Sequence, residues 1–350
     1  MVRVLLALAL GIVGLACYAA LTDPRPVDFL SFWAAGQLGA DAYNLALHKS
    51  VEETVVKFVG SQPFLNPPPF LFIVSPFAML PYGLAFVAWV GLTGSLFFAA
   101  TRRLDFPPVV ATGLVGQSAF LNTALFAFGV SQIQRRPMLA GCLIGCLVIK
   151  PQIAVLLPIA LIAGGYWKTL ASAALSSCVL CLAALLAFGW RAYAGFLATV
   201  GHHSEFIAMG VWPWWKMASP YAFCRAIGLT DGMAWIVHGL IAAAACFVVW
   251  RSWKTDDEAK IAILAGSSVL ISPYLFTYDA LLLVIPFVTL LRTNVRAAWC
   301  VWLLCLLPVL AIFGLYAGPN ATPVAAIIAI LALQVRHYAR PASGPSLTNP

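Results

Sequence analysis

Residues 82–101 read YGLAFVAWVGLTGSLFFAAT, a run of 20 residues without a charged side chain. A helix of about 20 apolar residues is long enough to cross the hydrocarbon core of a bilayer. Five further stretches of similar character lie along the chain, at 3–21, 169–189, 232–250, 297–316 and 321–336. This repetition predicts an all-α polytopic membrane protein.

The composition supports one membrane domain rather than a pair of soluble ones. Of the 350 residues, 62% are hydrophobic and 9% are charged, whereas soluble domains carry about 25% charged residues. We expect a single integral membrane domain over residues 1–340 and a disordered polar tail over residues 341–350. The apolar N-terminal run fits an uncleaved first span better than a signal peptide, because more spans follow it.

Three other apolar stretches are interrupted by a polar segment near the middle. They are 106–134, broken at Gly116-Gln117-Ser118; 137–166, broken at Lys150-Pro151-Gln152; and 259–292, broken between Ser272 and Asp279. We interpret each as two short helices that meet at one membrane face, where irregular backbone must line a polar cavity or be buried in protein. With these hairpins the chain would have about 10–12 spans. The stretch 69–80 is short and flanked by proline, which predicts a surface or re-entrant helix.

The net charge of +8 comes from small basic groups between apolar stretches, which is a topology signal rather than a nucleic-acid surface. Because short cytoplasmic loops are enriched in Lys and Arg, the N-terminus is predicted to be cytoplasmic. The two long loops, 22–81 and 190–231, then lie outside. Within the first, residues 29–39 and 42–59 resemble interfacial amphipathic helices.

Two charged residues are the main functional candidates. Asp28 follows the first span and precedes an aromatic-rich segment, where poor hydration would make its carboxylate a better proton acceptor. The alternative is a helix N-cap or a solvated loop residue. Lys150 is a lone cation between apolar arms and could face a lipid phosphate, or its side chain could snorkel to water. Asp279 could favour a helix dipole or belong to the same cavity.

Several short motifs, taken in order, resemble the opening of glycosyltransferase family 87. They are Asp28-Phe29-x-x-Phe32-Trp33-Ala34-Ala35, Asp41-Ala42-Tyr43 and Asn66-Pro67-Pro68-Pro69-Phe70, followed by Gly116-Gln117, Ile149-Lys150-Pro151-Gln152 and Ser272 through Asp279. The resemblance covers residues 25–290. It differs from the common family pattern at Trp33 and at the Asn-Pro-Pro-Pro segment, which leaves the sugar and the acceptor open.

The resemblance implies a GT-C fold and an inverting hexosyl- or pentosyltransferase in the bacterial plasma membrane, with an extracytoplasmic active site. A polyprenyl-phosphate sugar would be the donor and an envelope lipid or glycan the acceptor, without a metal or other cofactor. Asp28 would be the catalytic base. Lys150 would stabilise the leaving phosphate, with Arg191, His202 or His203 as alternatives. The other expected substrate-binding residues are Asp41, Tyr43, Asn66, Gln117, Gln152, Tyr274, Tyr278 and Asp279.

Two other function classes stay open at this point. A transporter or flippase would place its polar residues near the bilayer midplane, whereas most charges here lie in the predicted outer loops. An enzyme resembling O-antigen ligases or polymerases would use a late outer loop, and the loop 190–231 with His202 and His203 could serve that purpose. The essential residue would separate these possibilities, because the first interpretation depends on Asp28.

Overall fold

The computed structural model describes residues 2–25, 27–57, 62–209 and 213–339, and they form a helical bundle. The helices of the first half are α1 (Val2–Thr22), α2 (Asp28–Leu38), η1 (Gly39–Asp41), α3 (Leu45–Glu52), η2 (Pro68–Phe70), α4 (Leu71–Ala78), α5 (Tyr82–Thr101), α6 (Pro108–Val115), α7 (Ala119–Gln132), α8 (Pro137–Gly145), η3 (Cys146–Ile149), η4 (Pro151–Ile153) and α9 (Leu156–Ala163).

The second half continues with α10 (Trp167–Ala208), η5 (Trp214–Lys216), α11 (Pro220–Ala226), α12 (Asp231–Lys254), α13 (Lys260–Ile271), η6 (Thr277–Leu283), α14 (Val284–Thr293), α15 (Val295–Ile312) and α16 (Thr322–Ala339). Within the described residues, β pairing is limited to an isolated bridge between Met217 and Phe276. The predicted all-α class is therefore confirmed.

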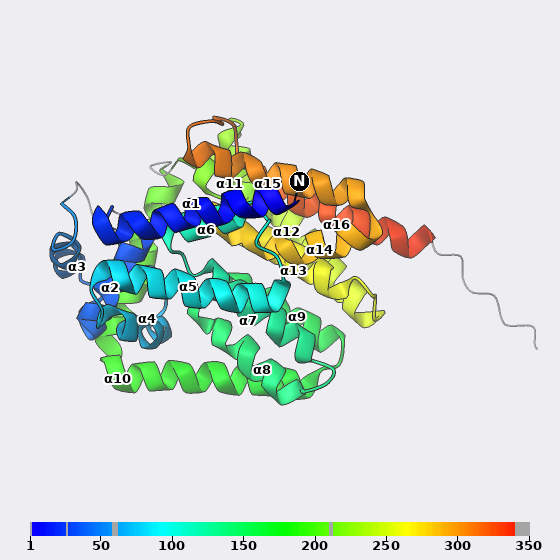
Figure 1. The fold of residues 1–350 in the computed structure, drawn as a ribbon. Helices are drawn as coiled ribbons and strands as arrows, with labels where there is room; N and C mark the ends of the chain where they lie inside the picture. Colours follow the sequence, from blue (N-terminus) through cyan, green and yellow to red (C-terminus); the bar gives the residue numbers. More distant parts are fainter. Residues whose placement is uncertain (1, 26, 58–61, 210–212, 340–350) are drawn as a thin grey trace, which may run out of the picture.

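The long helices run roughly parallel to one another, and the short helices α2, α3 and α4 gather at one end of the bundle (Figure 1). Among the described residues, four helices are long and apolar enough to cross a membrane, in the ranges 82–101, 167–202, 231–254 and 295–312. Six shorter apolar helices accompany them, at 6–22, 68–78, 137–149, 151–163, 260–271 and 322–335. The polytopic arrangement predicted from the sequence is thus confirmed.

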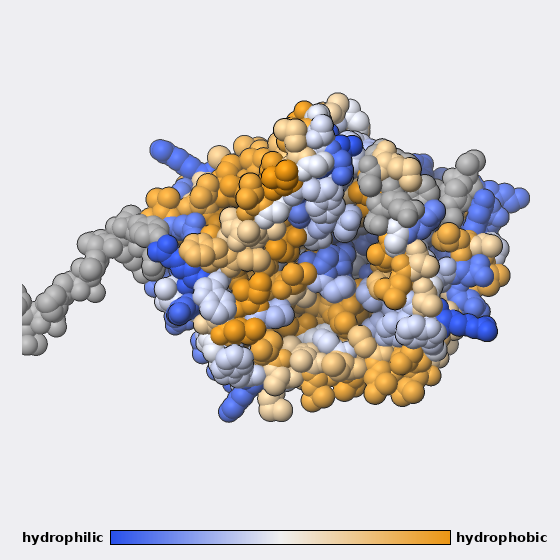
Figure 2. All heavy atoms as spheres, turned by 180° about the vertical axis from the view of Figure 1, so that it is seen from behind, coloured by the Kyte–Doolittle hydropathy of each residue, from blue (hydrophilic) through white to orange (hydrophobic). Residues whose placement is uncertain are grey.

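The surface of α10 shows why lipid suits this fold better than water. Leu175, Val179, Leu182 and Leu186 follow one another at helical spacing, and each is more than half exposed. Such a stripe of large apolar side chains would be costly in water, but it matches hydrocarbon. Figure 2 shows hydrophobic residues over much of one face, with hydrophilic residues at the two ends and in a central hollow.

All three predicted polar tips interrupt helices in the structure. The first lies between α6 and α7, where Gly116 adopts a left-handed φ of 66° that favours glycine. The second separates α8 and η3 from η4 and α9 at Lys150, which precedes a proline and leaves the helical conformation with a φ of −148° and a ψ of 71°. The third separates α13 from η6 at Ser272, which also precedes a proline. Local sequence therefore determines where these helices end.

Two expectations for the outer loops are wrong. Helix α2 is not an amphipathic surface helix, because Phe29, Leu30, Phe32, Ala34 and Ala35 are all buried. Neighbouring helices cover it, because α2 packs against α3, α4 and α5. The second predicted helix of this loop is also shorter than expected. It begins after Asn44, whose side chain caps α3, and it ends at Glu52.

The second long loop is also more helical than predicted. The span predicted over 169–189 does stop at Gly189, whose φ of 74° and ψ of 172° interrupt the helix. The chain then resumes helical structure as far as Ala208. Helix α10 contacts η1 and η2, and after the kink Phe196 packs on Tyr43 with ring centroids 5.9 Å apart, so part of the second loop lies against the first.

Candidate active site

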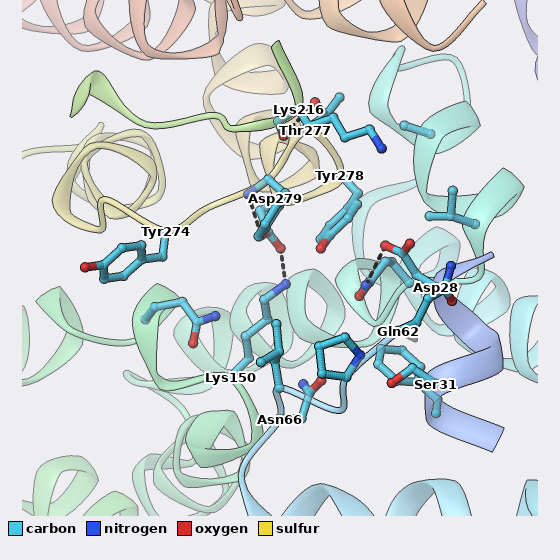
Figure 3. A pocket seen from close by; sticks show the side chains of 18 of the residues that line it. Asp28, Ser31, Gln62, Asn66, Lys150, Lys216, Tyr274, Thr277, Tyr278 and Asp279 are labelled. Carbon is cyan, nitrogen blue, oxygen red and sulfur yellow. Dashed lines mark hydrogen bonds and ion pairs between the residues drawn. The ribbon is translucent and has the colours of Figure 1, made fainter. Parts of the chain in front are cut away.

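The three polar tips and the two long loops surround a cavity of about 720 Å³. Its polar lining side chains are those of Asp28, Ser31, Gln62, Asn66, Gln117, Lys150, Gln152, Lys216, Tyr274, Thr277, Tyr278 and Asp279. Apolar residues such as Phe32, Phe196 and Ile207 complete the wall. The residues come from segments far apart in the sequence, and Figure 3 shows ten of the polar ones converging on one space.

Asp28 is the first residue of α2, and its carboxylate faces the cavity. Gln117 of the first tip donates a hydrogen bond from Nε2 to Asp28 Oδ2 at 2.9 Å. Burial raises the pKa of Asp28, although the Gln117 hydrogen bond and the charges of Lys216 and Lys150 act in the opposite direction. The Asp28 side chain makes no N-cap hydrogen bond, since Val27 is the N-cap residue. The position therefore matches the poorly hydrated carboxylate that was predicted.

Lys150 and Asp279 form a buried ion pair between the second and third tips. Nζ of Lys150 contacts Oδ1 of Asp279, and the side chains are 8% and 2% exposed. The other carboxylate oxygen of Asp279 accepts a hydrogen bond from the Phe276 backbone N at 3.1 Å. The snorkelling interpretation of Lys150 is wrong, because the amino group stays inside. Asp279 lies in the shared cavity, as one of its two interpretations required.

Tyr278 fills the space between this ion pair and the catalytic candidate. Its ring stacks on Phe276 with centroids 5.7 Å apart, and Nζ of Lys150 lies 4.9 Å from the ring centroid. An ammonium over an aromatic face is stabilised by the negative face of the ring. In Figure 3 the hydroxyl end of Tyr278 points toward the region between Lys150 and Asp28.

Amide and aromatic side chains form the remaining polar wall. Asn66 closes the first loop and donates from Nδ2 to the backbone O of Ile149 at 3.3 Å, which ties the loop to the second tip. Gln152 and Tyr274 line the cavity from the second and third tips. Tyr43 lies outside the cavity lining, and its hydroxyl donates a hydrogen bond to the backbone O of Asn66 at 2.6 Å.

The structure does not bring every predicted residue to the cavity. Asp41, Arg191 and His202 are exposed and do not line it. Tyr43 supports the wall from outside rather than lining it. The side chain of His203 lies outside the part of the chain that the structure describes. Within the described residues, no three His, Cys, Asp or Glu side chains gather in a way that could hold a metal ion.

Lys216 and Thr277 line the cavity although they were not among the predicted site residues. Lys216 sits in the Trp214–Lys216 turn, and its charge lowers the pKa of Asp28. A signal existed in the sequence, since Lys216 is a cation beside three tryptophans in a predicted outer loop. The sequence did not indicate the contact between this turn and the third tip.

The comparisons with known proteins agree with this arrangement. The sequence model of glycosyltransferase family 87 matches residues 64–273, which is more than half of the chain. The chain therefore belongs to glycosyltransferase family 87 and is a membrane glycosyltransferase. No curated protein and no solved structure gives a match. The matched range begins after Asp28 and ends before Asp279, so the roles of these two residues depend on the geometry of the cavity.

Proposed function

We propose that this glycosyltransferase moves a sugar from a polyprenyl-phosphate donor to a hydroxyl group of an envelope lipid or glycan, with inversion at the anomeric carbon. The observation that carries the proposal is the Asp28 carboxylate, which faces a large cavity and is held by Gln117 at 2.9 Å. A carboxylate fixed in this way can accept a proton from an acceptor hydroxyl. The family membership favours this enzyme class over a transporter.

The proposed step transfers one proton and one glycosyl group. The acceptor hydroxyl gives its proton to Asp28, and its oxygen forms a bond to the anomeric carbon. The bond from that carbon to the phosphate oxygen breaks, and its electron pair stays on the polyprenyl phosphate. Negative charge thus grows on the phosphate while Asp28 becomes neutral, so a nearby cation would stabilise the transition state.

The remaining cavity residues suit the other parts of the donor. Lys150 contributes a positive charge at the cavity wall, although Asp279 already pairs with it. Asn66, Gln117 and Gln152 present amide groups, which can exchange hydrogen bonds with sugar hydroxyls. Arg191 and His202 are left out of the phosphate site because they do not line the cavity.

The distribution of basic residues supports an extracytoplasmic site. All three tips and both long loops meet at the cavity, and the positive-inside rule favours the extracytoplasmic side of the plasma membrane for them. A donor anchored by a polyprenyl chain would be supplied from the outer leaflet. The apolar residues of the wall, such as Ile207 and Ile312, offer contacts for its chain.

The test uses the purified full-length protein with a polyprenyl-phosphate mannose probe and membrane extract as the acceptor source. Asp28→Asn should lower turnover by a factor of about 10² or more, which is the usual contribution of a general base. Asp41→Asn is the matched control, because Asp41 is exposed and lies outside the cavity. Retained turnover in Asp28→Asn would remove Asp28 as the base. Lipid and glycan profiling of a deletion strain would then identify the natural sugar and acceptor.

A further inference from the structure

The turn that carries Lys216 is held against the third tip by its backbone. Residues Trp214–Lys216 form η5, and the following residue, Met217, pairs with Phe276 in an isolated antiparallel bridge. Ala218 N donates to Leu275 O at 2.7 Å. These contacts give the turn a fixed place beside the cavity, where Figure 3 shows the Lys216 side chain next to Thr277.

Two side chains complete the attachment from the other side. The Thr277 hydroxyl donates to the backbone O of Lys216 at 3.1 Å. Asn320 donates from Nδ2 to Trp215 O at 3.0 Å and to Thr277 Oγ1 at 3.1 Å. Asn320 is completely buried, and its Oδ1 accepts from Thr322 N at 3.0 Å. Each polar atom of the Asn320 side chain therefore has a partner, so the amide is fixed in one orientation.

We propose that Lys216 binds the phosphate of the donor and that Asn320, acting through Thr277, is a positioning residue for Lys216. This inference rests on the proposed polyprenyl-phosphate donor and names the residue that recognises it. Lys216 and Lys150 are the two lysines that line the cavity in the described chain, and Asp279 balances the charge of Lys150. The charge of Lys216 acts on Asp28, which places it within electrostatic reach of the reacting groups.

The charges then fit each stage of the reaction. Before transfer, Lys216 faces both the Asp28 carboxylate and the phosphodiester of the donor. During transfer the proton neutralises Asp28, and the phosphate gains the negative charge that Asp28 loses. As Asp28 becomes neutral, its attraction for Lys216 disappears. Lys216 then stabilises the growing negative charge on the leaving phosphate without any movement of the protein.

Binding of a long-chain polyprenyl monophosphate to the full-length protein tests the role of Lys216, with the matching polyprenol as the uncharged comparison. Wild type should bind the monophosphate more tightly than the polyprenol. Lys216→Ala should weaken monophosphate binding by about tenfold or more, since a charge-assisted contact is lost. Lys216→Arg should keep most of the affinity because it keeps the charge. Neither change should alter polyprenol binding.

Steady-state kinetics test the role of Asn320. Asn320→Ala should raise the KM for the donor several-fold with a smaller change in kcat, and it should add little in a Lys216→Ala background. Thr277→Val should act in the same direction, whereas Thr277→Ser should restore the wild-type KM because it keeps the hydroxyl. Asn294→Ala is the matched control. Asn294 caps α15 through Ala297 N at 3.2 Å, so its loss should lower stability and leave the donor KM unchanged.

The outcomes separate this inference from the function on which it rests. If Asp28→Asn is inactive but Lys216→Ala binds the monophosphate as tightly as wild type, Lys216 is not the phosphate ligand and the proposed enzyme survives. If wild type does not distinguish monophosphate from polyprenol, the donor class and this inference both fail. If the effects of Asn320→Ala and Lys216→Ala on KM simply multiply, Asn320 is a structural residue and not a positioning one.

Discussion

Gln117 Nε2 lies 2.9 Å from Asp28 Oδ2, which joins the first polar tip to the start of α2. The two residues are 89 positions apart in the sequence. The hydrogen bond stabilises the ionised carboxylate, and it opposes the rise in the Asp28 pKa that burial causes. The same hydrogen bond therefore holds the proposed base in position and lowers its pKa.

The first prediction concerns pH. Asp28 must be ionised to accept a proton, so kcat/KM should increase as pH rises through its pKa. Because that pKa is raised, the acidic limb should lie above the ordinary Asp value of about 3.9. Gln117→Leu removes an interaction that lowers the pKa, so the limb should move to still higher pH. The measurement is the pH profile of kcat/KM.

Gln152→Leu provides the comparison for this experiment. Gln152 also lines the cavity, but it is not among the groups that shift the pKa of Asp28. Its loss should affect the KM and leave the acidic limb in place. A limb that stayed fixed in Gln117→Leu, or moved to lower pH, would contradict the assignment of the limb to Asp28.

The second prediction concerns the ion pair between Lys150 and Asp279. Removing one member leaves an uncompensated buried charge, which costs about 3–5 kcal/mol. Lys150→Met and Asp279→Leu should therefore each lower the thermal midpoint of the detergent-solubilised protein. The double variant should be more stable than the sum of the two single effects predicts, because no charge is left alone.

The exposed pair between Lys49 and Glu53 is a suitable control, with an N–O distance of 3.7 Å and both side chains more than 40% exposed. Surface pairs of this kind contribute about 0–1 kcal/mol. Glu53→Gln should thus leave the thermal midpoint nearly unchanged. Equal effects of Glu53→Gln and Asp279→Leu would show that the buried pair does not hold the second and third tips together.

The third prediction concerns Gly116. Its φ of 66° is unfavourable for other residues, and an added Cβ would lie 2.7 Å from Phe29 Cβ and 2.8 Å from the Phe86 ring. Gly116→Ala should therefore displace Phe29, the neighbour of Asp28, and lower both stability and turnover. Gly91→Ala is the control, because Gly91 is in α5 and no atom lies within 4 Å of the added Cβ. If both variants behaved like wild type, the first tip would be more adaptable than this geometry implies.

The fourth prediction concerns orientation. Alkaline phosphatase inserted in the exposed residues 44–47 should be active, since that loop is assigned to the outside. A green fluorescent protein inserted between Arg135 and Arg136, which are exposed in a short basic loop, should fluoresce as a cytoplasmic domain does. The reverse pattern would place the cavity on the cytoplasmic side and exclude the proposed donor route.

Local signals in the sequence predicted the helical class and the three polar tips. Pro151 and Pro273 restrict the residues that precede them, and Gly116 allows the left-handed turn. These effects act over one or two residues, so one chain is enough to detect them. The position of Asp28 after the first span made it a candidate, and the family resemblance added its expected role as the catalytic base.

Long-range contacts account for what the sequence did not predict. Lys150 and Asp279 are separated by 129 positions, and their pairing follows from packing rather than from either local motif. The backbone bridge between Met217 and Phe276 holds the turn with Lys216 beside the cavity. No local sequence pattern indicated this bridge. The burial of α2 depends on its contacts with α3, α4 and α5, which the sequence of α2 alone does not specify.

The contact between Asn320 and Trp215 has a consequence for how the protein is made. Asp28 and Lys150 are synthesised long before residues 277–320. The nascent chain therefore contains Lys150 before Asp279 is present, and it contains the Trp214–Lys216 turn before Asn320 is present. A lone ammonium group inside hydrocarbon is costly. During synthesis these side chains must therefore remain near water or lipid headgroups. The cavity is complete only after the segment before α16 has been synthesised and has packed against the part of the chain that was made earlier.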